Sequence, residues 1–274
     1  MNRKILFLDL DGTLLNSRRE ISKGNRAALE KALTLGHRVV INTGRPLNSA
    51  LIQNRRLGLT MDGCYLIAFN GGILYDSYRE EILYRQCLSM DTALAVSDLC
   101  SRRGLHVQTY DREQVLIEPR WEDEAVRRYC EKILMDYRVV PDFATGLTEA
   151  PPKVLAISYT DRPALEALQT EILAAFPEVD CFFSCQEYLE VVPRGVHKGS
   201  AIEMLCRRLG MDVADSIAAG DAENDLQMLR SAGLGCAMAN AVEAVKQAAG
   251  YVTTRDNDHD GVAEIVERFL LEEG

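Results

Sequence analysis

Apolar and amphipathic segments alternate along the first seventy residues. Three largely apolar runs have the length of strands buried on both faces: residues 5–8, 38–41 and 64–69. The segments between them, 22–35 and 46–58, carry apolar residues at helical spacing. Ser22 is the expected N-cap of the first, and the second begins at Pro46. Strands that alternate with helices in this way predict a parallel sheet with helical crossovers, which is an α/β fold.

The same alternation returns in the last third of the chain. Strands are expected at 216–219, 234–238 and 251–254, and helices at 199–209, 222–231, 241–249 and 261–271. The middle of the chain differs, because its expected strands and helices do not alternate. Its elements are helices at 89–103, 123–134 and 163–175, a hairpin of 106–110 with 115–118, and strands at 154–159, 181–184 and 188–192. We therefore predict a doubly wound core formed by 1–83 and 192–274, with an α+β domain inserted at 84–191.

Composition narrows the function classes. The chain has 274 residues, a formal net charge of -10 and a pI near 5.0, and its basic residues form no run longer than a pair. An acidic protein of this kind is not expected to bind nucleic acid. Its eight cysteines are scattered through apolar stretches and lack zinc-ligand spacing, so reduced thiols are expected. Neither a signal peptide nor a membrane span is recognisable, and the expected location is the cytoplasm.

Polar residues gather where the expected core strands end. Asp9 and Asp11 follow the first strand, Thr43-Gly44-Arg45 follow the second, and 220–225 follow the strand after the insert. Lys198 lies at the start of the helix that follows the insert. Each group alone also fits a turn or a helix cap. Ligands bind at the carboxyl edge of such sheets, and four groups converging there predict one site.

The residue types predict metal-assisted phosphoryl chemistry. Asp9, Asp11 and Asp221 offer oxygen ligands that suit Mg²⁺. A carboxylate such as that of Asp9 can attack phosphorus and form an acyl phosphate, provided that Mg²⁺ and Lys198 offset the charge repulsion. Asp11 can protonate the leaving alcohol and later deprotonate water, although a metal ligand or a turn residue is an alternative role for it.

Four further groups are candidates for holding the phosphate. Thr43 and the Gly44 N–H can contact its oxygens, Lys198 supplies a point charge, and Asn224 can donate an amide hydrogen. Thr43 could instead cap the helix near Pro46, and Lys198 could be a solvated charge. A cation is, however, disfavoured at a helix start, which favours a functional role for Lys198.

These motifs together resemble the haloacid dehalogenase-like superfamily, and their order and spacing resemble its Cof-type hydrolases. Asp9-Leu10-Asp11-Gly12-Thr13 resembles the first motif of the family, Asn42-Thr43-Gly44-Arg45 the second, Lys198 the third and Gly220-Asp221-Ala222-Glu223-Asn224-Asp225 the fourth. The resemblance implies a Rossmann-like core. It also implies that the Leu10 N–H contacts the phosphate and that Asp11 offers its backbone carbonyl to the metal. Asp225 would orient Lys198 or lie next to the metal ligands.

The position of the insert adds to the resemblance. The segment 10–42 has room for one helix, whereas 44–197 holds the whole insert. An α+β insert at this point resembles the second type of cap in the superfamily (subclass IIB), which closes over the site and selects the substrate. The resemblance thus implies a Mg²⁺-dependent phosphatase for small phosphorylated metabolites, such as sugar phosphates or pyridoxal phosphate, acting through an aspartyl phosphate on Asp9.

Two other functions stay open at this point. A phosphosugar mutase would use the same first step, although the cap of such enzymes usually precedes the second motif. A phospho-aspartate regulatory module also uses Asp, Mg²⁺, Thr and Lys on a doubly wound sheet, but it is about half this length and needs no residue in the role of Asp11. The physiological substrate and the oligomeric state are not readable from the sequence.

Several residues outside the motifs have open roles. Arg45 and His197 adjoin motif residues, and a structural role is favoured for both. Asp256, Asp258, His259 and Asp260 could form a metal cluster, but a solvated loop that caps the last helix is favoured. The aromatic residues Tyr110, Trp121 and Tyr188 of the insert fit the core or the surface of that domain better than a substrate pocket.

Overall fold

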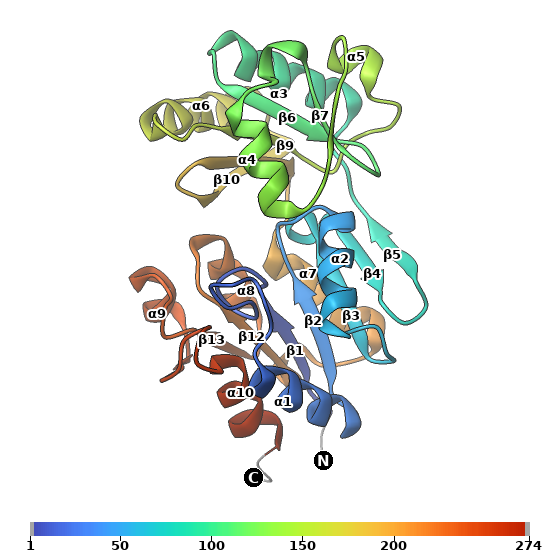
Figure 1. Ribbon diagram of the computed structural model, residues 1–274, viewed down its shortest axis with the longest axis vertical. Helices are drawn as coiled ribbons and strands as arrows, with labels where there is room; N and C mark the ends of the chain where they lie inside the picture. Colours follow the sequence, from blue (N-terminus) through green and yellow to red (C-terminus); the bar gives the residue numbers. More distant parts are fainter. Residues whose placement is uncertain (1–2, 272–274) are drawn as a thin grey trace. The chain divides into compact units, whose positions relative to one another are not determined.

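The computed structural model describes residues 3–271, and it divides into two compact units (Figure 1). Unit 1 holds the described parts of 1–44, 53–84 and 197–274. Unit 2 holds Arg45–Ile52 and Arg85–Val196. The segment 84–191, expected as an insert, lies in unit 2 except for its first residue. No composition change in the sequence indicates that 45–52 belongs to the same unit.

Unit 1 is built on an eight-stranded sheet in the order β14-β13-β12-β1-β2-β3-β4-β5. Its strands are β1 (Ile5–Leu8), β2 (Arg38–Asn42), β3 (Cys64–Ala68), β4 (Ile73–Asp76), β5 (Glu81–Arg85), β12 (Ser216–Gly220), β13 (Leu234–Ala237) and β14 (Tyr251–Val252). The six strands from β14 to β3 are parallel, and β4 is antiparallel to β3. The predicted α/β class with a parallel sheet is confirmed.

Strand β1 lies at the centre of this sheet and its register aligns the strand ends. Leu8 is paired with Ala219 of β12 and with Ile41 of β2. The residues that follow these three strands therefore meet at one edge, as expected for the carboxyl ends of parallel strands.

Helices pack on both faces of the sheet of unit 1. They are α1 (Lys23–Thr34), α7 (Lys198–Leu209), α8 (Leu226–Ser231), α9 (Glu243–Ala248) and α10 (Gly261–Val266), the last continued by a π-helical turn at Glu267–Leu271. Helix α2 (Leu47–Leu57) is divided between the units, with residues 47–52 in unit 2 and 53–57 in unit 1. Buried residues of α7, α8 and α9 pack with Ile5 and Phe7 on one face. Leu6 and Leu8 are buried toward the other face, where α1 packs against α10. Period-two alternation along β1 accounts for this division.

Local sequence accounts for the helix starts. The Ser22 hydroxyl accepts a hydrogen bond from the Asn25 N–H at 3.1 Å, as predicted for an N-cap. The helix expected at 222–231 is shorter, because a 3₁₀ turn at Glu223–Asp225 precedes α8. Strands β4 and β5 were not predicted, since they follow a glycine pair and carry no clear alternation.

Unit 2 contains a six-stranded sheet in the order β10-β11-β9-β6-β7-β8. Its strands are β6 (His106–Tyr110), β7 (Val115–Ile117), β8 (Tyr137–Val139), β9 (Val154–Ile157), β10 (Val179–Cys185) and β11 (Tyr188–Pro193), and its helices are α3 (Met90–Arg102), α4 (Glu124–Ile133), α5 (Phe143–Gly146) and α6 (Arg162–Ala175). Residues of α3 and α6 share one apolar core with Val107, Val154 and Val191 of the sheet. The expected hairpin is present as the antiparallel pair β6–β7.

A second set of buried side chains in unit 2 is polar. Lys153 forms an ion pair with Glu190 at 2.7 Å, and both are almost fully buried. Tyr110 exchanges a hydrogen bond with Tyr129 of α4 at 2.7 Å. Tyr110 and Tyr188 are buried in the interior of unit 2, and the half-buried Trp121 packs against its apolar core.

None of the helices within 3–271 combines the length and the apolarity that crossing a membrane requires.

Candidate active site

The loop after β1 turns back on itself and buries Asp9. The Asp9 N–H continues the parallel ladder by donating to the Ala219 carbonyl at 3.0 Å. The carbonyls of Asp9 and Leu10 then accept the N–H groups of Leu14 and Leu15. Asp9 consequently has only 6% of its surface exposed, directly at the carboxyl end of the central strand.

Lys198 is the first residue of α7, and its ammonium group reaches Asp9. The His197 side chain caps this helix by accepting the Ser200 N–H at 3.1 Å, and the Ser200 hydroxyl in turn accepts the His197 N–H. His197 is therefore a capping residue, as favoured from the sequence. The Lys198 Nζ lies 2.5 Å from Asp9 Oδ1 and 2.6 Å from Asp225 Oδ1, and the side chain is buried. Lys198 is therefore not a solvated charge at the helix start, because it forms two short ion pairs, with Asp9 and Asp225.

Asp225 connects this lysine to the loop after β12. Its Oδ1 accepts from Lys198, while its Oδ2 accepts the N–H groups of Asp221 at 3.0 Å and Ala222 at 3.1 Å. The side chain is fully buried. Both oxygens are therefore engaged, and Asp225 fixes the loop that carries Asp221 relative to the lysine.

Asp221 faces the loop that carries the first two aspartates. The Thr13 hydroxyl donates to Asp221 Oδ1 at 2.8 Å. Gly12 lies against the same carboxylate, since a Cβ on this residue would be 2.5 Å from Asp221 Oδ2, and its φ is +83°. Any side chain at this position would collide with the carboxylate and strain the backbone.

The electrostatics of this cluster reflect burial. Desolvation raises the pKa of Asp9 well above its usual value, and Lys198 opposes that rise. Desolvation and the charge of Asp225 raise the pKa of Asp221 to about 7. Burial would lower the pKa of Lys198, but Asp225 and Asp9 outweigh it, so the pKa is raised and the lysine stays charged. The carboxylates thus need more positive charge than Lys198 alone supplies.

The donor set fits a divalent cation. Carboxylate oxygens of Asp9, Asp221 and Asp225 lie within 4.8 Å of one another. Hard oxygen ligands around an excess of negative charge are typical of Mg²⁺ sites. Asp225 is the least suited of the three to be a ligand, because Lys198 and two backbone N–H groups already occupy its oxygens. Asp9 and Asp221 remain as the side chains that would hold the metal.

The other predicted site residues lie around this cluster. Asp11 is close enough to contribute to the raised pKa of Asp221. Thr43 follows β2 directly, and its N–H donates to the Ile67 carbonyl at 2.9 Å. Gly44 comes next in the chain, at the end of the first segment of unit 1. Asn224 is half-buried in the 3₁₀ turn that precedes α8.

The residues with open roles are also placed. Arg45 is buried in the 45–52 segment of unit 2 and donates to the Ser49 hydroxyl at 3.3 Å. Asp256 pairs with the exposed His259 at 2.6 Å, and Asp258 accepts the Ser17 N–H at 2.8 Å. Asp260 occupies the N-cap position of α10, as favoured from the sequence, but its side chain makes no cap hydrogen bond there. A φ of 64° at this residue places it in the left-handed region.

Sequence reasoning missed three residues of this neighbourhood. Thr13 belongs to the first motif, and a hydroxyl only two residues after Asp11 is a usable sequence signal for a contact with the carboxylates. The Asn42 amide donates to the Lys198 carbonyl at 3.0 Å and ties β2 to the start of α7. Asn70, in a turn after β3, donates its N–H to the Thr43 carbonyl at 3.0 Å, and no local sequence pattern predicts this hydrogen bond.

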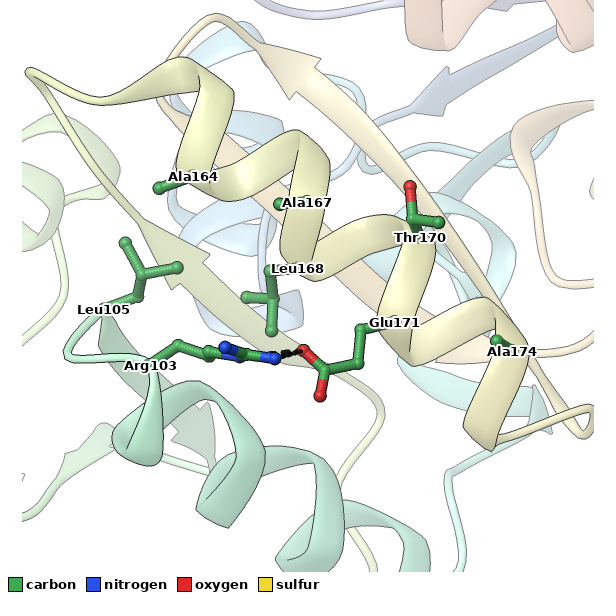
Figure 2. A pocket seen from close by; sticks show the side chains of 8 residues that line it. All are labelled: Arg103, Leu105, Ala164, Ala167, Leu168, Thr170, Glu171 and Ala174. Atoms are coloured by element: carbon green, nitrogen blue, oxygen red, sulfur yellow. Dashed lines mark hydrogen bonds and ion pairs between the residues drawn. The ribbon is translucent and has the colours of Figure 1, made fainter.

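A separate pocket lies in unit 2, between the end of α3 and α6 (Figure 2). Its volume is ≈ 510 Å³, and three alanines and two leucines form much of its lining. Figure 2 shows its one ion pair, between Arg103 and Glu171, at 2.7 Å. This lining has no nucleophile beside a cation, so the carboxylate cluster of unit 1 is the better candidate for chemistry.

Comparison with known proteins agrees with the residues assembled in unit 1. Residues 6–266 match the family of haloacid dehalogenase-like hydrolases. A relative from Bacillus subtilis (strain 168), a 5-amino-6-(5-phospho-D-ribitylamino)uracil phosphatase, is 30% identical over 98% of this chain and 96% of its own length.

Solved structures agree as well. A haloacid dehalogenase-like hydrolase from Bacteroides thetaiotaomicron is 34% identical, with a TM-score of 0.88 over 97% of this chain and 99% of the other. A sugar phosphatase of HAD subclass IIB is 26% identical, with a TM-score of 0.82 over 97% and 98% of the two chains. The predicted family is confirmed.

Proposed function

The chain belongs to the haloacid dehalogenase-like hydrolase family and is an enzyme of the phosphatase type, and from this premise we propose that it is a Mg²⁺-dependent phosphatase that forms an aspartyl phosphate on Asp9. The observation that carries the proposal is the contact of the buried Asp9 carboxylate with the buried Lys198 ammonium, beside Asp221. The groups that we propose as nucleophile, fixed cation and second metal ligand therefore lie within one cluster.

The proposed reaction has two steps. Lys198 binds Asp9 Oδ1, so we assign the attack to Oδ2, which bonds to phosphorus as the bond to the leaving oxygen breaks. Asp11 gives its proton to the leaving alcohol. A water molecule then attacks the phosphorus and passes a proton to Asp11, the bond from phosphorus to Asp9 breaks, and inorganic phosphate leaves.

The remaining site residues bind and orient. Thr43, the N–H groups of Leu10 and Gly44, and the Asn224 amide hold the phosphate oxygens, with Lys198 as the fixed charge. Asp9, Asp221 and the Asp11 backbone carbonyl would hold Mg²⁺. When bound, the metal offsets the negative charge that the carboxylate and the phosphate bring together. Asp225 orients Lys198.

Small phosphorylated metabolites are the proposed substrates. Two relatives in the comparison act, by their names, on a phosphorylated ribitylamino-uracil and on sugar phosphates. We extend the class to phosphorylated cofactors such as pyridoxal phosphate. Unit 2 is proposed as the cap that selects among them, which would explain an insert of this size between the second and third motifs.

The first test is turnover of p-nitrophenyl phosphate with and without Mg²⁺, followed by a screen of sugar phosphates and phosphorylated cofactors. Rapid quenching with borohydride should convert a phosphorylated Asp9 to homoserine, which peptide mass spectrometry detects. Asp9→Asn should abolish both signals and leave the circular dichroism spectrum unchanged. Turnover by Asp9→Asn would refute covalent catalysis at this residue. Transfer of the phosphate to another hydroxyl, rather than its release, would indicate a mutase. A stable phosphoprotein without turnover would indicate a regulatory module.

A further inference from the structure

The turn after β3 has an unusual backbone. Three successive residues have positive φ: Phe69 (51°), Asn70 (56°) and Gly71 (112°), and all three are buried. Left-handed conformations are unfavourable for a phenylalanine and tolerated by an asparagine. Such strain persists only where the surrounding structure imposes it, and it is concentrated at functional sites.

This turn holds the loop that follows β2. The Asn70 N–H donates to the Thr43 carbonyl at 3.0 Å, and the Thr43 N–H donates to the Ile67 carbonyl at 2.9 Å. Both backbone groups of Thr43 are therefore bound by the segment that β3 and the turn supply. The left-handed bend is what brings the Asn70 N–H back toward β2.

The Asn70 side chain lies against Gly44. A Cβ on Gly44 would be 2.9 Å from Asn70 Oδ1 and 3.2 Å from Nδ2, closer than ordinary contacts allow. Gly44 is not among the glycines with positive φ. Glycine at this position therefore leaves room for the Asn70 amide, which any larger side chain would have to displace.

The same turn also touches the start of α7. A Cβ on Gly71 would be 2.8 Å from the carbonyl oxygen of His197, the residue before Lys198. From the β2 side, the Asn42 amide binds the Lys198 carbonyl at 3.0 Å. The turn thus packs between the Thr43–Gly44 loop and the helix start that carries the lysine.

We propose that Asn70 is a positioning residue for phosphate binding, which sets the Thr43–Gly44 loop at its distance from Lys198. This inference rests on the proposed function, since it assigns the loop and the lysine to one phosphate. Glycine would satisfy the backbone of this turn at least as well as asparagine. The amide side chain against Gly44 is therefore the part that the proposal concerns.

The test compares Asn70→Gly and Asn70→Asp with the wild type. Asn70→Gly keeps the turn and removes the amide, so kcat/KM for p-nitrophenyl phosphate should fall roughly 10- to 100-fold, since small misplacements of binding groups have effects of this size. Inhibition by inorganic phosphate should weaken about as much, while the melting temperature without phosphate stays within the wild-type range. Asn70→Asp keeps the shape of the side chain but adds a negative charge beside the Thr43–Gly44 loop, so it should lose at least as much activity as Asn70→Gly.

The matched control is Glu80→Gly. Glu80 has nearly the same left-handed backbone (φ 55°), but it is exposed in the turn between β4 and β5. Kinetics and phosphate inhibition of this variant should match the wild type. If Asn70→Gly keeps kcat/KM and phosphate inhibition within twofold of the wild type, the inference is overturned.

A second measurement separates this inference from the proposed function. Inorganic phosphate with Mg²⁺ should raise the melting temperature of the wild type more than that of Asn70→Gly. If the wild type releases no p-nitrophenol but shows this difference, the proposed activity fails and the role of Asn70 stands. Equal shifts in the two proteins, or none in either, would overturn the role of Asn70.

Discussion

Replacing Asp225 by asparagine is expected to destabilise unit 1 although the two side chains have nearly the same shape. Asp225 Oδ1 accepts from the Lys198 ammonium, and Oδ2 accepts two backbone N–H groups, of Asp221 and Ala222. An amide has one oxygen and one NH₂ group. Whichever way it is turned, the NH₂ group faces either the ammonium or the two N–H donors.

The size of the effect follows from these contacts. Breaking a buried ion pair by removing one partner costs about 3–5 kcal/mol, and we take the lower end because Lys198 keeps Asp9 as its second partner. The melting temperature should fall by roughly 6–12 °C, from about 2–4 °C per kcal/mol for chains near this size. This melting temperature is measured on the Mg²⁺-free protein by far-UV circular dichroism during thermal unfolding. Asp212→Asn, which changes an exposed cap, should shift the free energy of unfolding by less than about 0.5 kcal/mol.

A double-mutant cycle tests the cause. In a Lys198→Met background the ammonium is gone, so the asparagine can turn its oxygen to the two backbone N–H groups and its NH₂ group toward Asp9. Asp225→Asn should then cost below about 1 kcal/mol, which gives a coupling energy of roughly 2 kcal/mol. An equal cost in both backgrounds would refute the reasoning, because the clash between the amide and the lysine would then contribute nothing.

Two further predictions concern side chains on either unit. Thr13→Val removes the hydroxyl that donates to Asp221 at 2.8 Å, so the Mg²⁺ concentration for half-maximal turnover should rise by about 10-fold. Thr13→Ser keeps a hydroxyl and should stay near the wild type. Equal Mg²⁺ requirements in the two variants would contradict a role of the Thr13 hydroxyl in orienting Asp221. In unit 2, hydrogen bonds from Arg112 and Arg85 lower the pKa of Glu149 to about 2. A lowered carboxyl pKa stabilises the folded state above the usual value of 4.5, and this stability is lost as the pH falls toward 2. Glu149→Gln should therefore lower the free energy of unfolding by about 1 kcal/mol at pH 7, allowing for solvent screening, and by less at pH 3. Urea unfolding at the two pH values, followed by fluorescence of the single tryptophan in unit 2, measures these free energies. A loss of stability that is the same at pH 7 and pH 3 would contradict the role of the ionised Glu149.

The sequence predicted the parts of unit 1 that depend on short-range patterns. Buried parallel strands such as β1 and β2 need continuous apolar runs, and α1 begins at a serine that acts as an N-cap, so both are visible locally. The convergence of Asp9, Lys198 and Asp221 could be expected because residues after parallel strands meet at one sheet edge. Their roles in catalysis remain predictions.

Other features could not be read from the sequence, because they depend on contacts between distant segments. The left-handed turn at Asn70 is imposed by packing against the Thr43–Gly44 loop and α7, and nothing in the local sequence requires a phenylalanine with positive φ. Asp225 was expected either to orient Lys198 or to lie near the metal. Its two backbone hydrogen bonds favour the first of these, and they depend on the path of the loop after β12. Strands β4 and β5 were missed because glycines precede them and their side chains alternate weakly.

The sheet of unit 1 also has a consequence for synthesis of the chain. Its central strand β1 pairs on one side with β2, which follows soon after, and on the other with β12, more than two hundred positions later. The sheet of unit 2 uses strands from His106–Tyr110 to Tyr188–Pro193 only. On a ribosome, the insert can therefore complete its sheet while β1 still lacks its second neighbour. The loop that carries Asp9 must wait for the last quarter of the polypeptide before Asp221 and Asp225 emerge.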